Sequence, residues 1–188
     1  IYDRLVFGDV KHHTLASLAK EVPVIGLNGL SKSFLMPGWR MGYVYFQDVG
    51  NQLTELKEAI KSEARQRLSA CTPVMRACIK AFELKEHFKE VNRKLKERGE
   101  YAWKRFNEMN RISAVKPKGA FYIFPKVDLS DRWHTDGEFC LDVMRNTGIV
   151  FPYGSGFDPV YGKSHFRSVI LPPVEAMERA FDKLEEFM

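Results

Sequence analysis

Apolar residues recur at two different periods along the first half of the chain. Short apolar runs beside glycine predict buried strands over residues 23–27 and 41–46. Apolar residues three or four positions apart predict helices over residues 52–67, 74–82 and 85–109. The second of these helices follows a Thr-Pro pair, and proline suits the first turn of a helix because an N–H there has no intrahelical partner.

The second half of the chain alternates between strands and helices. Strand-like runs cover residues 112–115 and 120–124, with a Lys-Pro-Lys-Gly turn signal between them. Two further runs cover residues 149–153 and 165–171. Because strands alternate with helices, the pattern indicates an α/β protein whose second half forms a small α/β unit of its own.

Two helices of the second half have recognisable ends. Thr135 and Glu138 have the spacing of a capping box, and Gly148 follows the last apolar position in the manner of a C-terminal cap. The last helix opens after a Pro-Pro pair. The side chains expected to face inward are Phe139, Val143 and Met144 in the first helix and Val174, Met177, Phe181 and Leu184 in the second.

The formal net charge of +5 raises the question of a nucleic-acid partner. Residues 85–105 hold eight basic and four acidic residues, so this segment alone accounts for +4 of the excess. Its apolar residues form a seam at helical spacing: Phe88, Val91, Leu95, Ala102, Phe106 and Met109. The charges are thus the solvated face of an amphipathic helix, and no aromatic residues are interleaved among them. We expect no nucleic-acid partner.

Composition narrows the class of protein further. The 188 residues are 45% hydrophobic and 28% charged, as in ordinary globular proteins, and no apolar run approaches the roughly 18–20 residues of a membrane span, so we expect no membrane partner. Cys71, Cys78 and Cys140 match no disulfide or zinc framework and are expected to be buried or half-buried thiols in a reducing cytoplasm. His12 and His13 lack a second ligand pair, so no metal site is predicted.

The most informative motif lies in residues 28–43. Lys32 follows a predicted buried strand, and a Pro-Gly turn, expected to be of type II with Gly38 at positive φ, separates it from Arg40. This turn allows Ser31, Lys32 and Arg40 to converge. A hydroxyl and a guanidinium suit a phosphate group, and a lysine amine in an apolar pocket beside a cation suits a Schiff base, which together suggest pyridoxal phosphate. On spacing alone, a loop lysine and a surface arginine explain the motif equally well.

The motif Ser-Lys-x4-Pro-Gly-x-Arg-x-Gly-Tyr, which begins at Ser31, resembles the lysine-site signature of class I pyridoxal-phosphate-dependent aminotransferases of fold type I. The resemblance implies that Lys32 forms the Schiff base and shuttles the proton, and that Ser31 and Arg40 bind the cofactor phosphate. The opening Ile-Tyr-Asp resembles the end of the family's Asp-x-x-Tyr element, which implies that Tyr2 bonds to the ring oxygen of the cofactor. The Gly-Ala-Phe-Tyr run that ends at Tyr122 resembles a strand of the small domain.

The C-terminal region resembles the family as well. The run Phe-Arg-x3-Leu-Pro-Pro around Arg167 is most similar to that of alanine aminotransferases, including archaeal ones. The resemblance implies that Arg167 binds the α-carboxylate of the substrate. An arginine in an apolar strand calls for an anionic partner in any case, so a structural salt bridge or an edge-strand position is the alternative.

The resemblance also sets the expected extent of the chain. The Asp of the Asp-x-x-Tyr element falls ahead of residue 1, so we expect the chain to be the C-terminal half of a family member and inactive alone. Residues 1–84 are expected to be the end of the large cofactor domain, with a mixed, mostly parallel sheet. Residues 85–188 are expected to form a long interdomain helix and a small α/β domain. The full-length protein is expected to be a cytoplasmic homodimer.

The implied reaction is amino-group transfer between an amino acid, with alanine favoured, and a 2-oxo acid such as 2-oxoglutarate. A second carboxylate calls for a second cation, which Arg65 or Arg67 can supply, although a solvent-facing helix end explains both residues equally well. The alternatives are a carbon–sulfur lyase of the same fold, because the lysine motif is shared across reaction types, and a catalytically inactive small-domain fragment.

Overall fold

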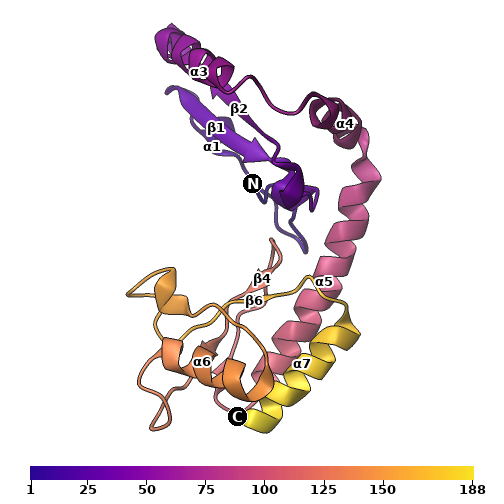
Figure 1. Ribbon diagram of the computed structural model, residues 1–188, viewed down its shortest axis with the longest axis vertical. Coiled ribbons are helices and arrows are strands. Elements are labelled where there is room, and N and C mark those ends of the chain that lie inside the picture. The colour runs from indigo at the N-terminus through magenta and orange to yellow at the C-terminus, as the bar shows by residue number, and fades with distance from the viewer. The chain divides into compact units, whose positions relative to one another are not determined.

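The computed structural model describes residues 1–188, which form two compact units, residues 1–91 and 92–188. Both units combine helices with short strands, so the predicted α/β class is confirmed (Figure 1). Helix α5 (Lys85–Glu108) contributes its first residues to the first unit and the remainder to the second. No helix has both the length and the apolar character that a bilayer crossing requires.

The first unit contains a single hairpin and several helices. In chain order its elements are α1 (Leu15–Leu18), β1 (Val24–Gly29), α2 (Leu30–Ser33), η1 (Pro37–Trp39), β2 (Gly42–Gln47), η2 (Val49–Asn51), α3 (Thr54–Gln66) and α4 (Thr72–Glu83). The predicted strands and helices are therefore present, with their ends shifted by one or two residues.

The two strands of the first unit pair antiparallel along their full length, from Val24 opposite Gln47 to Gly29 opposite Gly42. The prediction of a mostly parallel sheet is wrong for the strands in this chain. The reason is that residues 30–41 turn the chain back on itself, which makes β1 and β2 a hairpin. Apolar side chains of this sheet remain in contact with solvent, with Leu27 79% exposed.

Aromatic side chains join the start of α5 to α2 within the first unit. The ring of Phe34 lies 5.0 Å from that of Phe88, edge to face, and 5.7 Å from the ring of Phe82. His87 stacks on the same ring at 5.7 Å. Cys78 is buried as predicted, but Cys71 is exposed, because it precedes the first turn of α4 rather than lying on its inner face.

The second unit holds short strands between longer helices. After α5 come β3 (Ile112–Ser113), β4 (Tyr122–Ile123), β5 (Lys126–Val127), α6 (Asp136–Thr147), η3 (Gly154–Gly156), β6 (Ser168–Val169) and α7 (Val174–Phe187). β3 pairs with β5 and β4 with β6, both antiparallel. The strand predicted over residues 149–153 is wrong, since only Tyr153 forms a bridge, to Phe166. Pro152 lacks the N–H that a ladder requires there.

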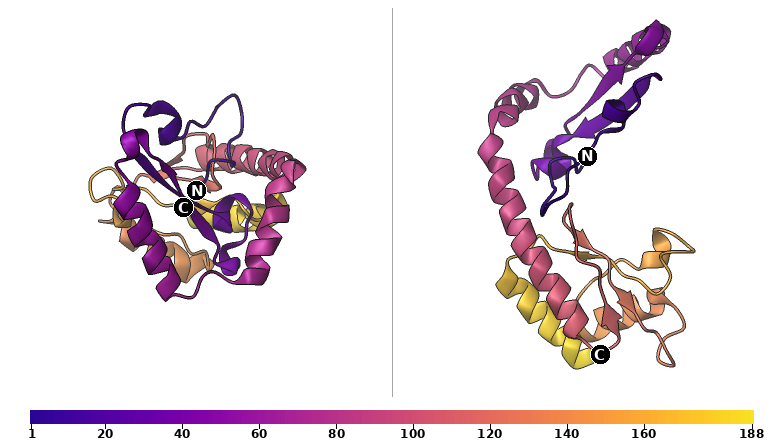
Figure 2. Two further views of the ribbon diagram at one scale, coloured as in Figure 1. Left: turned by 90° about the horizontal axis from the view of Figure 1, so that it is seen from above. Right: turned by 180° about the vertical axis from the view of Figure 1, so that it is seen from behind.

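The core of the second unit lies where α7 runs alongside the C-terminal half of α5 (Figures 1 and 2). Phe106 of α5 is fully buried, and its ring lies 4.6 Å from Phe181 of α7 and 5.6 Å from Phe166. At the edge of this contact, Arg105 donates to Asp182 and Glu185, each at 2.9 Å. Burial disfavours the charged guanidinium, but bonds to Asp182, Tyr101 and Glu185 outweigh it and raise the pKa of Arg105.

Helix α6 confirms the predicted cap at each end. The Thr135 hydroxyl accepts from the N–H of Glu138 at 3.1 Å, and Gly148 ends the helix with φ of 76°. Met144, which was predicted to face inward, is 38% exposed, and Cys140 is buried in its place. The buried stripe of α6 passes through Cys140 and its i+3 neighbour, so Met144 falls on the flank. Burial, with a smaller contribution from Asp136, raises the pKa of the Cys140 thiol to about 12.

Candidate functional site

The loop of residues 30–41 carries three of the predicted site residues. Its ends are joined by the hydrogen bond from Leu30 N–H to the Met41 carbonyl, 3.1 Å, and by the last pair of the β1–β2 ladder. A Cβ on either glycine of that pair, Gly29 or Gly42, would lie 3.0 Å from a backbone oxygen of the opposite strand. The close approach of the strands therefore favours glycine at both positions, and the loop that carries Lys32 is closed at its base.

Lys32 and Ser31 lie in α2, the single helical turn that follows β1 directly, and both side chains are half-buried. Arg40 is exposed near the other end of the loop, and its Nη1 donates to the Pro37 carbonyl at 2.8 Å. The backbone thus brings these residues onto one closed loop. The convergence of their side chains on a single point stays a prediction.

The turn between Lys32 and Arg40 differs from the predicted one. Pro37 opens a 3₁₀ turn, η1, and Gly38 does not adopt positive φ. Leu35 and Arg40 adopt the left-handed conformation instead, with φ of 55° and 52°. The type II prediction is wrong because two non-glycine residues flanking the Pro-Gly pair reverse the chain direction. The left-handed Arg40 is one of the strained positions of the loop.

The N-terminal segment lies against α2. The Ser33 hydroxyl is within hydrogen-bond distance of the Ile1 carbonyl, 3.1 Å, and of Asp3 Oδ1, 3.3 Å. These two partners flank Tyr2, which is half-buried, and Ser33 directly follows Lys32. Two residues that the sequence places far apart, Tyr2 and Lys32, therefore lie on segments that contact each other.

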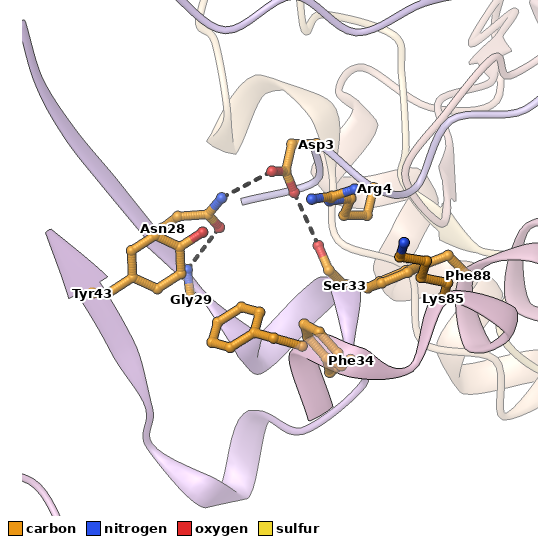
Figure 3. Close-up of a pocket in the computed structure, with 10 residues that line it drawn as sticks. Asp3, Arg4, Asn28, Gly29, Ser33, Phe34, Tyr43, Lys85 and Phe88 are labelled. Atoms are coloured by element: carbon orange, nitrogen blue, oxygen red, sulfur yellow. Dashed lines mark hydrogen bonds between the residues drawn. The ribbon is translucent and has the colours of Figure 1, made fainter. Parts of the chain in front are cut away.

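Asp3 joins this segment to β1 as well. Asn28 Nδ2 donates to Asp3 Oδ2 at 3.1 Å, and Asn28 Oδ1 accepts from the N–H of Gly29 at 2.7 Å (Figure 3). Figure 3 shows the Asp3 carboxylate between the Asn28 amide and the hydroxyl of Ser33, which is only 3% exposed. Sequence reasoning missed these three residues. Asp3 and Asn28 are 25 positions apart, and no local pattern indicates such a pairing.

A cavity of about 460 Å³ opens beside this network in the first unit (Figure 3). It is lined by Asp3, Arg4, Asn28, Gly29, Ser33, Phe34, Tyr43, Phe82, Lys85 and Phe88. The lining includes the two residues after Lys32 but neither Lys32 nor Arg40. Partial burial and the nearby Asp3 carboxylate raise the pKa of the Tyr43 hydroxyl. Tyr43 therefore stays protonated in this cavity at neutral pH.

Arg167 lies in the second unit, directly before β6, where its N–H donates to the Pro152 carbonyl at 2.9 Å. Its guanidinium lies over the ring of Tyr122, 4.5 Å from the centroid, and over that of Phe157, at 4.6 Å. No salt bridge joins it to an acidic side chain of the chain, so the structural ion pair considered as an alternative is absent. The half-buried guanidinium is therefore stabilised by cation–π contacts with two aromatic rings and by no acidic side chain.

The remaining candidates lie on the surface. Arg65 and Arg67 are exposed at the C-terminal end of α3, as the solvent-facing interpretation predicts. A part for either residue in binding a second carboxylate stays a prediction. His12 and His13 are exposed in the segment before α1.

Comparison with known proteins gives consistent matches over the whole chain. The profile of the family described as "Aminotransferase class I and II" matches residues 1–184. The chain is 32% identical to the glutamate-pyruvate aminotransferase AlaA of Haemophilus influenzae and 32% identical to an aspartate aminotransferase of Pyrococcus abyssi. Each match covers 100% of this chain and 47% of the relative.

Solved structures agree with these matches. The alanine aminotransferase from Pyrococcus furiosus superimposes with a TM-score of 0.92 at 48% identity, covering 100% of this chain and 47% of that one. The chain therefore spans about half the length of the curated relatives it matches.

Proposed function

Because the chain belongs to the class I and II aminotransferase family, we propose that it supplies the cofactor lysine and the substrate arginine of a pyridoxal-phosphate-dependent aminotransferase. The observation that carries this proposal is the contact between the N-terminal segment and α2. Ser33, the residue after Lys32, bonds to groups on both sides of Tyr2. The two segments that hold the proposed ring contact and the proposed cofactor lysine are thereby adjacent.

The donor set of the first unit fits the cofactor. Lys32 offers a primary amine for its attachment, and Ser31 and Arg40, on the same closed loop, offer a hydroxyl and a guanidinium suited to its phosphate. Tyr2 offers a phenol to its ring oxygen. When bound, pyridoxal phosphate supplies an electron sink for the pair left on the substrate α-carbon after loss of a proton.

Lys32 and Arg167 have separate proposed roles, in proton transfer and in substrate binding. Lys32 removes the proton from the substrate α-carbon as a general base and holds it, and as a general acid it would deliver that proton to the cofactor carbon that carries the amino group. Arg167 binds the substrate α-carboxylate through two parallel hydrogen bonds, an interaction that fixes both position and orientation. Orientation matters because the α-carbon proton leaves fastest when its bond is aligned with the electron sink.

The proposed substrates are alanine and 2-oxoglutarate. The relatives that support this choice are a glutamate-pyruvate aminotransferase and, at 48% identity, an alanine aminotransferase. An aspartate aminotransferase matches with 32% identity, so aspartate is the second candidate amino donor. We further propose that the full-length protein is a homodimer, which size-exclusion chromatography with light scattering tests.

The test measures amino-group transfer by the full-length protein loaded with pyridoxal phosphate. We expect alanine consumption that depends on 2-oxoglutarate, faster than with aspartate and without release of pyruvate from cystathionine. Lys32→Ala should abolish the reaction, whereas Lys20→Ala, at an exposed position outside the loop, should leave it unchanged. Pyruvate release from cystathionine with no transfer would favour the lyase instead.

A further inference from the structure

The guanidinium of Arg167 is held by two rings that come from different segments. Tyr122 belongs to β4, whose partner β6 begins one residue after Arg167, so the sheet itself places that ring. Phe157 comes from the loop after η3 and is 53% exposed, so burial in the core does not fix its position. Its ring also lies 6.1 Å from that of Phe124, edge to face, and a second feature fixes the backbone of its loop.

That feature is a buried carboxylate. Asp136, in the first turn of α6, is 3% exposed, and its two oxygens accept from Ser155. The N–H of Ser155 donates to Oδ2 at 2.6 Å and its hydroxyl donates to Oδ1 at 2.8 Å. Because a buried carboxylate is costly without partners, these two bonds tie Ser155 firmly to the start of α6. Phe157 follows two residues later.

The rest of the loop is equally constrained. A Cβ on Gly154 would collide with the Gly162 carbonyl oxygen, and one on Gly162 would collide with that of Gly154, so the two ends of the loop lie in direct contact. Between them, Asp158 Oδ1 accepts from the N–H groups of Val160 and Tyr161 at 2.8 and 2.7 Å. Contacts and hydrogen bonds within the loop of residues 154–162 therefore fix the backbone that carries Phe157.

We propose that Phe157, fixed by the Ser155–Asp136 bonds, is a positioning residue that orients the Arg167 guanidinium for the substrate carboxylate. The inference rests on the proposed function of Arg167. Aromatic rings suit this task because they hold a cation over their faces without supplying a competing anion. The N–H groups, which lie in the plane of the guanidinium, stay available for a carboxylate.

The test compares ring removal with a matched change in the same loop. Phe157→Leu removes the ring and keeps an apolar side chain, and Phe157→Tyr retains the ring. Tyr161→Leu changes an exposed ring of the same loop that does not lie over the guanidinium. In the full-length protein, calorimetric titration with propionate, which offers only a carboxylate, measures binding apart from catalysis. Thermal unfolding shows whether each variant is folded.

We expect Phe157→Leu to raise the dissociation constant of propionate about threefold to tenfold, the range that loss of one cation–π contact gives. The KM for alanine should rise by a similar factor while kcat changes much less. In the Phe157→Tyr variant, the dissociation constant of propionate and the KM for alanine should both equal those of the unmodified protein. Ser155→Ala, which removes one of the two bonds to Asp136, should raise the dissociation constant in the same direction. Tyr161→Leu should match the unmodified protein.

Two results separate this inference from the proposed function. If Arg167→Gln abolishes propionate binding while a folded Phe157→Leu variant binds as tightly as the unmodified protein, the positioning role is wrong and the substrate arginine stands. If Arg167→Gln leaves propionate binding and the KM for alanine unchanged, the proposed role of Arg167 is wrong, and the positioning role is wrong with it.

Discussion

Ser33→Ala tests the contact that joins the N-terminal segment to α2. The hydroxyl lies near two acceptors, the Ile1 carbonyl and Asp3 Oδ1, but it has one proton and donates to one acceptor at a time. The loss is therefore one hydrogen bond, charge-assisted for part of the time. Such bonds contribute about 0.5–1.5 kcal/mol to stability when neutral and about 1.5–3 kcal/mol when charged. We therefore expect Ser33→Ala to lower the free energy of unfolding by about 1.5 kcal/mol.

Two features of the structure place the expected loss of unfolding free energy near the middle of this range. Ser33 is 3% exposed, so water does not replace the lost partner easily. The Asp3 carboxylate, in contrast, is half-buried and keeps its bond from Asn28, which limits the penalty for the acceptor left behind. The substitution removes a single oxygen and leaves a cavity too small to add much.

The assay is urea denaturation of the full-length protein, in which unfolding is monitored by a spectroscopic signal that reports on the first unit. A double-mutant cycle of Ser33→Ala and Asp3→Ala isolates the pair, and we expect a coupling energy of about 1 kcal/mol. Ser113→Ala, at an exposed position in the second unit, is the control and should stay within about 0.5 kcal/mol of the unmodified protein. A coupling energy of zero within error would refute the argument that this bond holds the segments together.

Three further predictions concern other parts of the chain. At pH 8 a soluble thiol reagent should modify the exposed Cys71 within minutes, whereas Cys140, whose burial raises its pKa to about 12, should react only on unfolding. Gly162→Ala should lower the unfolding midpoint of the second unit by several degrees, because its Cβ collides with a backbone carbonyl; a normal midpoint would contradict the closed loop. The pKa of Asp48 is lowered, because the hydrogen bonds from Lys57 and from the Leu53 N–H outweigh the effect of burial. The ionised carboxylate therefore stabilises the folded state above pH 3.8, and the free energy of unfolding should fall as acid protonates Asp48 below that pH. Asp48→Asn should remove this part of the pH dependence, as measured by denaturation from pH 2 to 6.

Features set by local periodicity were predicted well from the sequence. The apolar seam of α5 buries Leu95 and Phe106 as expected, and Thr135 and Gly148 cap α6. The resemblance to class I aminotransferases, drawn from the motif that contains Lys32, is confirmed by the family match and by related structures. Such features depend on residues three or four positions apart or on a contiguous motif, both of which a single sequence displays.

Features set by tertiary contacts were missed or wrong. The hydrogen bonds from Ser33 to Ile1 and Asp3 join residues about 30 positions apart, and no sequence period relates them. Pro37 and Gly38 predicted a type II turn, but the surrounding hairpin places positive φ at Arg40. The proposed parts of Lys32, Ser31, Arg40, Tyr2 and Arg167 stay proposals, because each concerns contacts with molecules other than the chain itself.

The proposed function requires that the cofactor is attached to Lys32. The direct measurement is reduction of the full-length protein with borohydride after incubation with pyridoxal phosphate, followed by proteolysis and mass spectrometry of the peptides. We expect one stoichiometric phosphopyridoxyl group, on Lys32, and none in the Lys32→Ala variant. Stoichiometric modification of a different lysine, or none in a folded protein, would contradict it.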